Sequence, residues 1–121
     1  MNRREFESLI FETYGVKPEY PWEKYPTFEV YRHKANRKWF AVIMTVEKSK
    51  IGIKADGLID IVNLKSDFDI ITLARQEKGF FPAYHMNKEH WLSVALDGSV
   101  DKEKLKFLLG LSFDLTFATK K

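Results

Sequence analysis

The segment YHMNKEHW, residues 84–91, concentrates the side chains of this chain that are most suited to chemistry. Within a few positions of one another it places His85, Asn87, Lys88 and His90. Imidazoles titrate near neutral pH and lysine supplies a cation, so these side chains can hold an anion in a pH-sensitive way. The structural alternative is that Asn87 caps a short turn through residues 88–90, and that Trp91 then plugs the core. Both interpretations stay open on the sequence alone.

Two short polar connections carry clustered positive charge. The segment RHKANRK contributes Arg32, Lys34, Arg37 and Lys38, and the connection at residues 47–50 contributes Lys48 and Lys50. As turns of hairpins, they can contact nucleic-acid phosphates with an affinity that falls as salt is added. Alternatively, the charges at residues 32–38 only prevent edge-to-edge aggregation of the sheet. The net charge of +3 permits an anionic partner but does not require one.

Most other kinds of functional site lack a sequence signal. The chain has no cysteine, which excludes disulfide and thiolate chemistry and is typical of cytoplasmic proteins. The spacing of His85 and His90 fits neither an HExxH nor a zinc-finger pattern, and GxSxG, P-loop and dinucleotide motifs are missing. We therefore expect no metal, no cofactor and no enzymatic activity. No apolar run reaches about 18 residues, so no membrane span is expected, and the acidic residues near the start are unlike a signal peptide.

Apolar periodicity predicts a single α+β domain over residues 1–121. Helices are expected at residues 3–14, from Ser66 to Gly79 and at residues 102–117, the first capped by Asn2 and the last by Asp101. Strands are expected at residues 28–33, 39–46, 51–54, 58–64, 80–84 and 91–96. The links between strands are short, with a tight turn at Asp56 and Gly57 between the third and fourth, so the sheet should be antiparallel with its helices on one face.

Residues 16–27 contain three of the four prolines and should form a stiff, irregular connection. Its aromatic side chains are Tyr20, Trp22 and Tyr25. We expect them to cover one end of the core, and a ligand-facing aromatic patch is the alternative.

Several motifs together resemble the MmcQ/YjbR-like family of small bacterial proteins. They are NLKSD at residues 63–67, YHMNKEHW at 84–91, LDGSV at 96–100, SFD at 112–114, WFAVI at 39–43 and PW at 21–22. The likeness covers nearly the whole chain. The sequence departs from the family pattern at Phe68 and Asp101, where proline is common, and at Phe113, where tyrosine is usual.

The resemblance implies an α+β fold similar to the bacterial frataxin homologue, without implying its iron chemistry. It also implies binding to double-stranded DNA through two basic β-hairpins, with the six basic residues of the two connections on phosphates. His85, Asn87, Lys88 and His90 would be secondary contacts. The alternative function is a small-molecule or protein-interaction module built on residues 84–91 and the nearby aromatics. The sequence does not indicate an oligomeric state.

Overall fold

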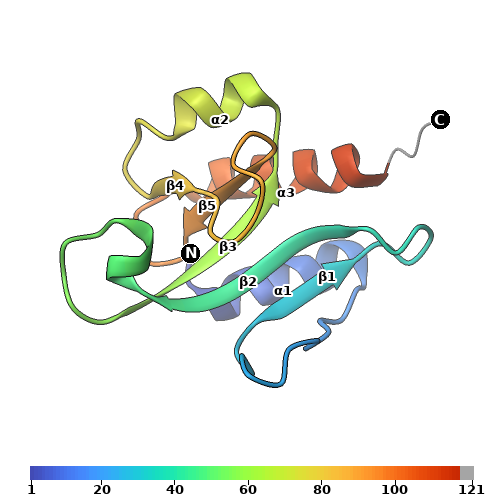
Figure 1. Cartoon of the computed structure of the whole chain (residues 1–121). Helices are drawn as coiled ribbons and strands as arrows, with labels where there is room; N and C mark the ends of the chain where they lie inside the picture. Colours follow the sequence, from blue (N-terminus) through green and yellow to red (C-terminus); the bar gives the residue numbers. More distant parts are fainter. Residues whose placement is uncertain (118–121) are drawn as a thin grey trace.

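The computed structural model describes residues 1–117, which form one five-stranded antiparallel sheet with helices (Figure 1). The strands are β1 (Glu29–Arg32), β2 (Trp39–Glu47), β3 (Leu58–Lys65), β4 (Phe80–Pro82) and β5 (Trp91–Ala95), in the spatial order β1-β2-β3-β5-β4. The helices are α1 (Arg3–Tyr14), α2 (Phe68–Ala74) and α3 (Lys102–Phe117), with a 3-10 turn, η1 (Lys48–Ile51). The predicted α+β class and antiparallel pairing are confirmed.

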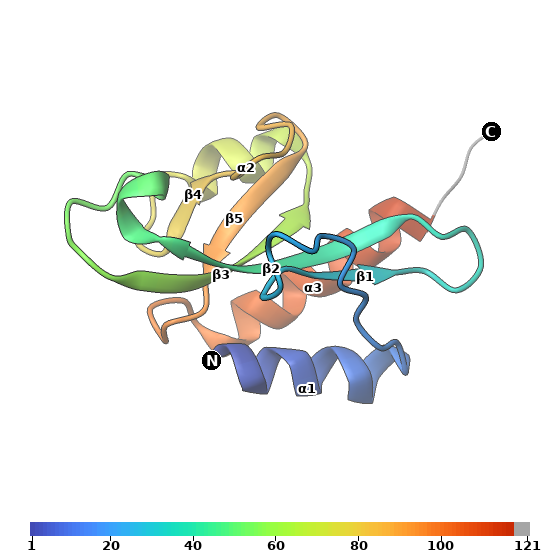
Figure 2. The same ribbon diagram turned by 60° about the horizontal axis from the view of Figure 1, so that its bottom comes forward.

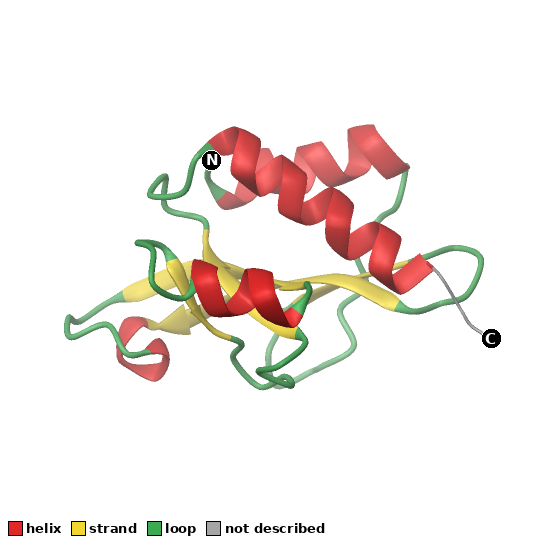
Figure 3. Cartoon of the chain, turned by 90° about the horizontal axis from the view of Figure 1, so that it is seen from above, coloured by secondary structure: helices red, strands yellow, loops and turns green. Residues whose placement is uncertain are grey.

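The sheet carries a different apolar cluster on each face. All three helices contribute to one cluster, for example through Phe6, Ile71 and Leu105. Figures 2 and 3 show α1 and α3 on the same side of the sheet. The other cluster contains Val42 and Met44, and side chains from loops and from η1 cover it. Because strand residues alternate between faces, the apolar strands can supply both clusters at once. The face without helices is therefore where the loops can build a site.

Local capping fixes the ends of α1 and α3 as the sequence predicts. The Asn2 side chain accepts from the backbone N–H of Glu5, whose carboxylate accepts from the N–H of Asn2 in return. Asp101 accepts from the N–H groups of Glu103, at 3.1 Å, and Lys104, at 3.2 Å, in the first turn of α3. Ser112, buried on α3, donates to the carbonyl of Phe40 at 2.6 Å and so ties this helix to the sheet.

The expected strand at residues 51–54 and the two-residue turn after it are wrong. The chain instead forms η1 after β2 and then a loop to β3. The backbone N–H of Lys48 bonds the carbonyl of Gly57 at 3.0 Å, so the loop closes on itself. Ile51 is buried in the cluster on the face without helices, and Gly52 takes the left-handed backbone (φ 89°) that ends η1. One helical turn buries this isoleucine, and a glycine is available to terminate the turn.

Two further expectations need correction. The second helix begins at Phe68 rather than Ser66, since the N–H of Ser66 is held by the carbonyl of His90 at 2.9 Å, and it ends at Ala74. Trp91 does not plug the core: it is only partly buried and belongs to neither apolar cluster. It pairs with Lys65 where β3 and β5 end, so too few neighbours surround it.

Candidate ligand-binding pocket

The elbow at residues 84–91 is held by local hydrogen bonds. The Asn87 side chain accepts from the N–H groups of Glu89, at 2.8 Å, and His90, at 3.2 Å. Its carbonyl accepts from the N–H of Trp91 at 2.9 Å. The structural role expected for Asn87 is therefore present. The side chain is occupied by its own turn rather than presented to a ligand.

A buried polar pair below the elbow fixes the position of Tyr84. Asn63 on β3 donates to the carbonyl of Tyr84 at 2.9 Å, and the N–H of Tyr84 donates to Ser93 Oγ on β5 at 2.9 Å. Ser93 in turn donates to Asn63 Oδ1. Asn63 and Ser93 are fully buried, and both backbone groups of Tyr84 are satisfied. This arrangement holds the start of the elbow rigidly over the sheet.

His85 adopts a left-handed backbone (φ 59°), which is uncommon for a residue with a side chain. Its ring lies against that of Tyr84, with the ring centroids 4.0 Å apart. Both side chains line a pocket over the face of the sheet without helices. Strained backbone of this kind is concentrated at functional sites, which makes His85 a residue of interest.

The pocket is strongly aromatic and has a volume of about 380 Å³. Its walls come from the proline-rich loop, from β2 and from the elbow, and they are Trp22, Tyr25, Phe28, Trp39, Val42, Met44, Tyr84, His85 and Met86. The indoles of Trp22 and Trp39 meet edge to face, 5.7 Å apart at 86°. Tyr25 stacks on Phe28 at 4.8 Å. The ligand-facing alternative for the aromatic loop thus finds a physical pocket, although Tyr20 is not among its walls.

A second hollow of about 360 Å³ shares Tyr84 and His85 with the aromatic pocket. Its other lining residues are Lys50, Ile51, Pro82, Ala83 and Lys88. The ammonium of Lys88 donates one hydrogen bond to the carbonyl of Ala83 at 2.9 Å. The ammonium has three N–H groups, and this bond uses one of them. Of the described residues, no aspartate or glutamate lines either hollow. The arrangement is apolar and aromatic on one side and cationic on the other.

The basic hairpin between β1 and β2 is used for internal contacts. Arg32 Nε donates to Glu19 Oε1 at 3.0 Å and Arg37 donates to Glu19 Oε2 at 2.7 Å. His33 is buried, with its Nε2 2.7 Å from Thr116 Oγ1, so the hairpin is docked onto the end of α3. Lys34 and Lys38 are exposed. The two arginines support the aromatic loop through Glu19.

The structure does not bring all the predicted basic residues to one place. The hairpin of Arg32, Lys34, Arg37 and Lys38 and the connection of Lys48 and Lys50 lie at opposite ends of β2 (Figure 1). A nine-residue strand spans about 30 Å. Lys50 instead lies with His85 and Lys88 at the second hollow, whereas His90 is exposed elsewhere on the elbow.

A partly buried charge network anchors the base of the aromatic loop. Arg3 pairs with Glu7 at 3.2 Å and with Glu29 at 3.4 Å, and it donates to the carbonyl of Thr27. The Tyr20 hydroxyl donates to Glu29 at 2.7 Å, and this bond raises the pKa of Tyr20 to about 12. Burial raises the pKa of Glu7, and the nearby Glu29 carboxyl adds to the shift. The loop is thus joined to both α1 and β1.

Comparison with known proteins places this fold in a family. The YjbR family model matches residues 11–115. The chain belongs to the YjbR family. This member is similar to the uncharacterized protein YyaQ of Bacillus subtilis, at 40% identity over 96% of this chain and 98% of that protein. A crystal structure of a Pseudomonas syringae protein superposes with a TM-score of 0.94, at 41% identity over 96% of this chain and 99% of that one.

A more distant structure extends the likeness of this YjbR family member. A Deinococcus radiodurans protein described as containing a DUF419 domain superposes with a TM-score of 0.70, at 26% identity over 94% of this chain and 77% of that one. These relatives bear out the predicted family. Nothing in their names identifies a ligand, and the expected DNA binding, frataxin-like detail and cytoplasmic location stay predictions.

The described part of this YjbR chain shows neither a cluster of metal ligands nor a helix that could span a membrane. Residues 1–117 contain no group of three or more histidine, aspartate and glutamate side chains that could hold a metal ion. No helix of the same segment is long and apolar enough to cross a bilayer. The expected lack of a cofactor and of enzymatic activity stays a prediction.

Sequence reasoning missed the supporting residues of the pocket in this YjbR protein. Glu19, Asn63 and Ser93 position the walls, although none was singled out as a candidate. The available signal was a polar residue within the apolar strand IVNL and another within WLSVA. Such positions need buried partners, and here the partners are each other and the elbow backbone.

Proposed function

We propose that this protein is a non-enzymatic binding module for a small anionic ligand that has a planar apolar part. The observation that carries the proposal is the shared wall of Tyr84 and His85 between an aromatic pocket and a hollow containing two lysines. Ligand sites are typically concave, largely apolar and provided with a few convergent polar groups. The aromatic rings on one side favour a planar apolar part of the ligand, and the ammonium groups on the other side favour an anionic part.

The proposal is supported by the rigidity of the walls. Glu19 and Glu29 anchor the loop that carries Trp22 and Tyr25, and the pair of Asn63 and Ser93 anchors the elbow. A preformed pocket avoids part of the entropy cost of ordering side chains when the ligand binds.

The test is a tryptophan-fluorescence titration with 1-naphthyl phosphate, using 1-naphthol as the uncharged comparison. The phosphate ester should quench the emission of Trp22 and Trp39 and bind at least tenfold more tightly than naphthol, since Lys50 and Lys88 act only on the anion. The Lys50→Met/Lys88→Met variant should lose this preference, whereas Lys34→Met/Lys38→Met, at the remote hairpin, should keep it. Equal affinity for both compounds, or no binding of either, would reject the proposed site.

Binding of double-stranded DNA is a second candidate, supported by one distance. The turns that carry Lys34 and Lys38 at one end and Lys48 and Lys50 at the other are separated by the length of β2, about 30 Å. This approaches the roughly 34–36 Å of one turn of B-DNA. Arg32 and Arg37 leave the expected set of phosphate contacts, because both are bound to Glu19.

A salt titration of a labelled duplex tests this candidate. With four lysines as contacts, the logarithm of the binding constant should fall with the logarithm of salt concentration at a slope no steeper than about −3.6. The fourfold lysine-to-methionine variant should remove most of that slope. A duplex that shows no binding at low salt, measured by fluorescence anisotropy, would eliminate the second candidate.

A further inference from the structure

We propose that the ligand of the two neighbouring hollows is a mononucleotide, with its base in the aromatic pocket and its phosphate between Lys50 and Lys88. This inference rests on the proposed function and specifies its ligand class. It begins from the separation of the two hollows, which share only Tyr84 and His85 among their lining residues.

The separation distinguishes a nucleotide from a simple aromatic acid. The rings of Tyr84 and His85, 4.0 Å apart, stand where the two hollows meet. A ligand that occupies both hollows is favoured when its charged group projects away from its ring. In a carboxylic acid joined directly to its ring the charged oxygens lie two bonds from the ring, and in 1-naphthyl phosphate they lie three bonds from it. A nucleotide places a ribose between base and phosphate, so of these ligands it spans the two hollows best.

The aromatic pocket suits a heterocyclic base. Its walls include the rings of Trp22, Tyr25, Phe28 and Trp39, and bases stack on such faces independently of their identity. The Tyr25 ring, stacked on Phe28, remains half exposed and presents its other surface at the rim. The volume of about 380 Å³ lies within the range of small-molecule sites.

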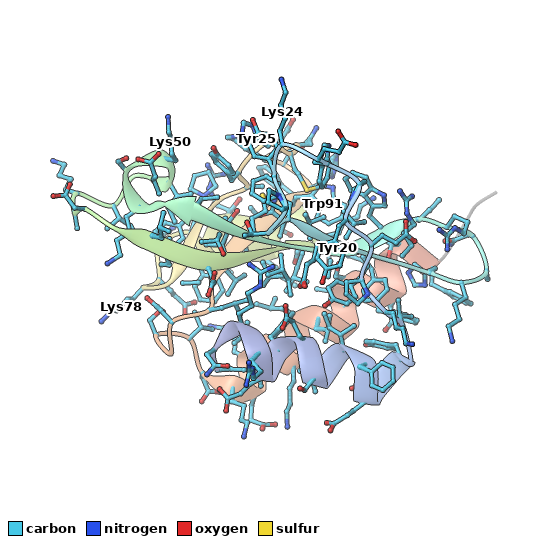
Figure 4. All side chains as sticks on the ribbon, turned by 90° about the horizontal axis from the view of Figure 1, so that it is seen from below. Tyr20, Lys24, Tyr25, Lys50, Lys78 and Trp91 are labelled. Carbon is cyan, nitrogen blue, oxygen red and sulfur yellow. The ribbon has the colours of Figure 1, made fainter. Side chains whose placement is uncertain are left out.

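The charges match a phosphate better than a carboxylate. A phosphate monoester carries a charge of about −1.5 to −2 at neutral pH, and the hollow offers two lysines with His85 beside them. The absence of acidic lining residues among those described leaves this positive charge unopposed within the hollow. Figure 4 shows Lys50 with Lys24 and Tyr25 on the side of the molecule that faces away from α1. Cations on this face also attract an anion during its approach.

The experiment is an isothermal titration of the whole protein with AMP, adenosine, ribose 5-phosphate and 1-naphthyl phosphate at neutral pH. AMP should bind at least tenfold more tightly than adenosine or ribose 5-phosphate, because each of these fills only one hollow. Tyr25→Ser, at an exposed rim position, should weaken AMP binding by about tenfold through lost stacking. Lys50→Met/Lys88→Met should bring the affinity for AMP down to that for adenosine, and Lys34→Met/Lys38→Met serves as the matched control.

The outcomes separate this inference from the proposed function. If naphthyl phosphate binds in the pocket but AMP does not, the nucleotide assignment is overturned while the anion-binding module stands. If neither binds, both fail. A titration with a short single-stranded oligonucleotide completes the set. If its binding is weakened by Tyr25→Ser and AMP does not bind, the ligand is a nucleic-acid strand and the mononucleotide inference is likewise overturned.

Discussion

Glu19 accepts a hydrogen bond from Arg37 at 2.7 Å, which joins the proline-rich loop to the β1–β2 hairpin. The pair is partly exposed, and Arg32 completes it from the other side of the carboxylate. A residue expected to contact DNA thus serves the geometry of a neighbouring pocket. The loop that carries the aromatic walls and the basic hairpin are thus held together as one unit by the ion pairs of Glu19.

Glu19→Gln should loosen this unit. The hydrogen bond from Arg37 holds the pKa of Glu19 below its usual value of 4.5. The ionised carboxylate therefore stabilises its contact with Arg37 above pH 4.5, and this stabilisation is lost as the pH falls through the lowered pKa. We expect faster amide hydrogen exchange in residues 19–25 and several-fold weaker naphthyl phosphate binding, with little change in global stability because the site is exposed. Glu23→Gln, on the same loop, is the control. Identical amide hydrogen exchange in the two variants would show that the contact of Glu19 with Arg32 and Arg37 does not hold the loop in place.

Arg3→Met should be strongly destabilising. It leaves the buried Glu29 carboxylate without its ion-pair partner, and removal of one member of such a pair costs about 3–5 kcal/mol. Urea unfolding measures the loss, and Arg4→Met, at an exposed position on the same helix, should change stability by less than about 0.5 kcal/mol. Adding Glu29→Gln to Arg3→Met should restore part of the stability. Equal unfolding midpoints for the two single variants would contradict this account of the network.

His33 should make stability fall in mild acid. Burial lowers the pKa of His33 below its usual 6.5, because the charged imidazole is disfavoured between the hairpin and α3. The neutral imidazole contributes its full share of the unfolding free energy above about pH 6.5. This share is lost as the pH falls toward and through the lowered pKa that His33 has in the folded protein. The difference in unfolding free energy between the wild type and His33→Asn should therefore shrink from pH 7.5 to pH 5. A pH-independent difference for His33→Asn would count against the assignment.

His85→Gly should separate binding from stability. A left-handed backbone costs a residue with a Cβ about 1–2 kcal/mol, which glycine avoids at a smaller entropic cost. We expect stability to be unchanged or to rise by up to about 1 kcal/mol, whereas naphthyl phosphate binding should weaken because a wall of both hollows is removed. His90→Gly, where the backbone is not left-handed, should be destabilising without affecting the ligand. A His85→Gly protein that binds normally would show that the strain has no functional role.

The sequence predicted the local features well because they depend on neighbouring residues. The capping box of Asn2, the cap at Asp101 and the turn of Asn87 each involve partners within three or four positions. The pocket could not be predicted in the same way. Its walls are drawn together by packing, from Trp22 to Met86, and periodicity carries no information about which loop lies over which face.

The ion pairs of the basic hairpin could not be predicted for a related reason. The sequence shows which residues are charged but not which of them pair, and the partner of Arg32 and Arg37 lies in a different loop. Likewise, Ile51 was expected to begin a strand over residues 51–54, but it is buried at the end of the 3-10 turn η1. In both cases a tertiary contact overrode the local pattern.

The pocket joins segments that are distant along the chain, and this has a consequence for how the protein folds. Trp22 and His85 line the same pocket although they are far apart in the sequence, and the pairing of β1 with β2 and of β3 with β5 lies between them. Closing so large a loop is entropically costly, so we expect these contacts to form late. In a refolding experiment, the quenching of Trp22 fluorescence by bound ligand would then report the last step of folding. A chain that has formed its helices but has not yet brought Trp22 and His85 together would show no quenching.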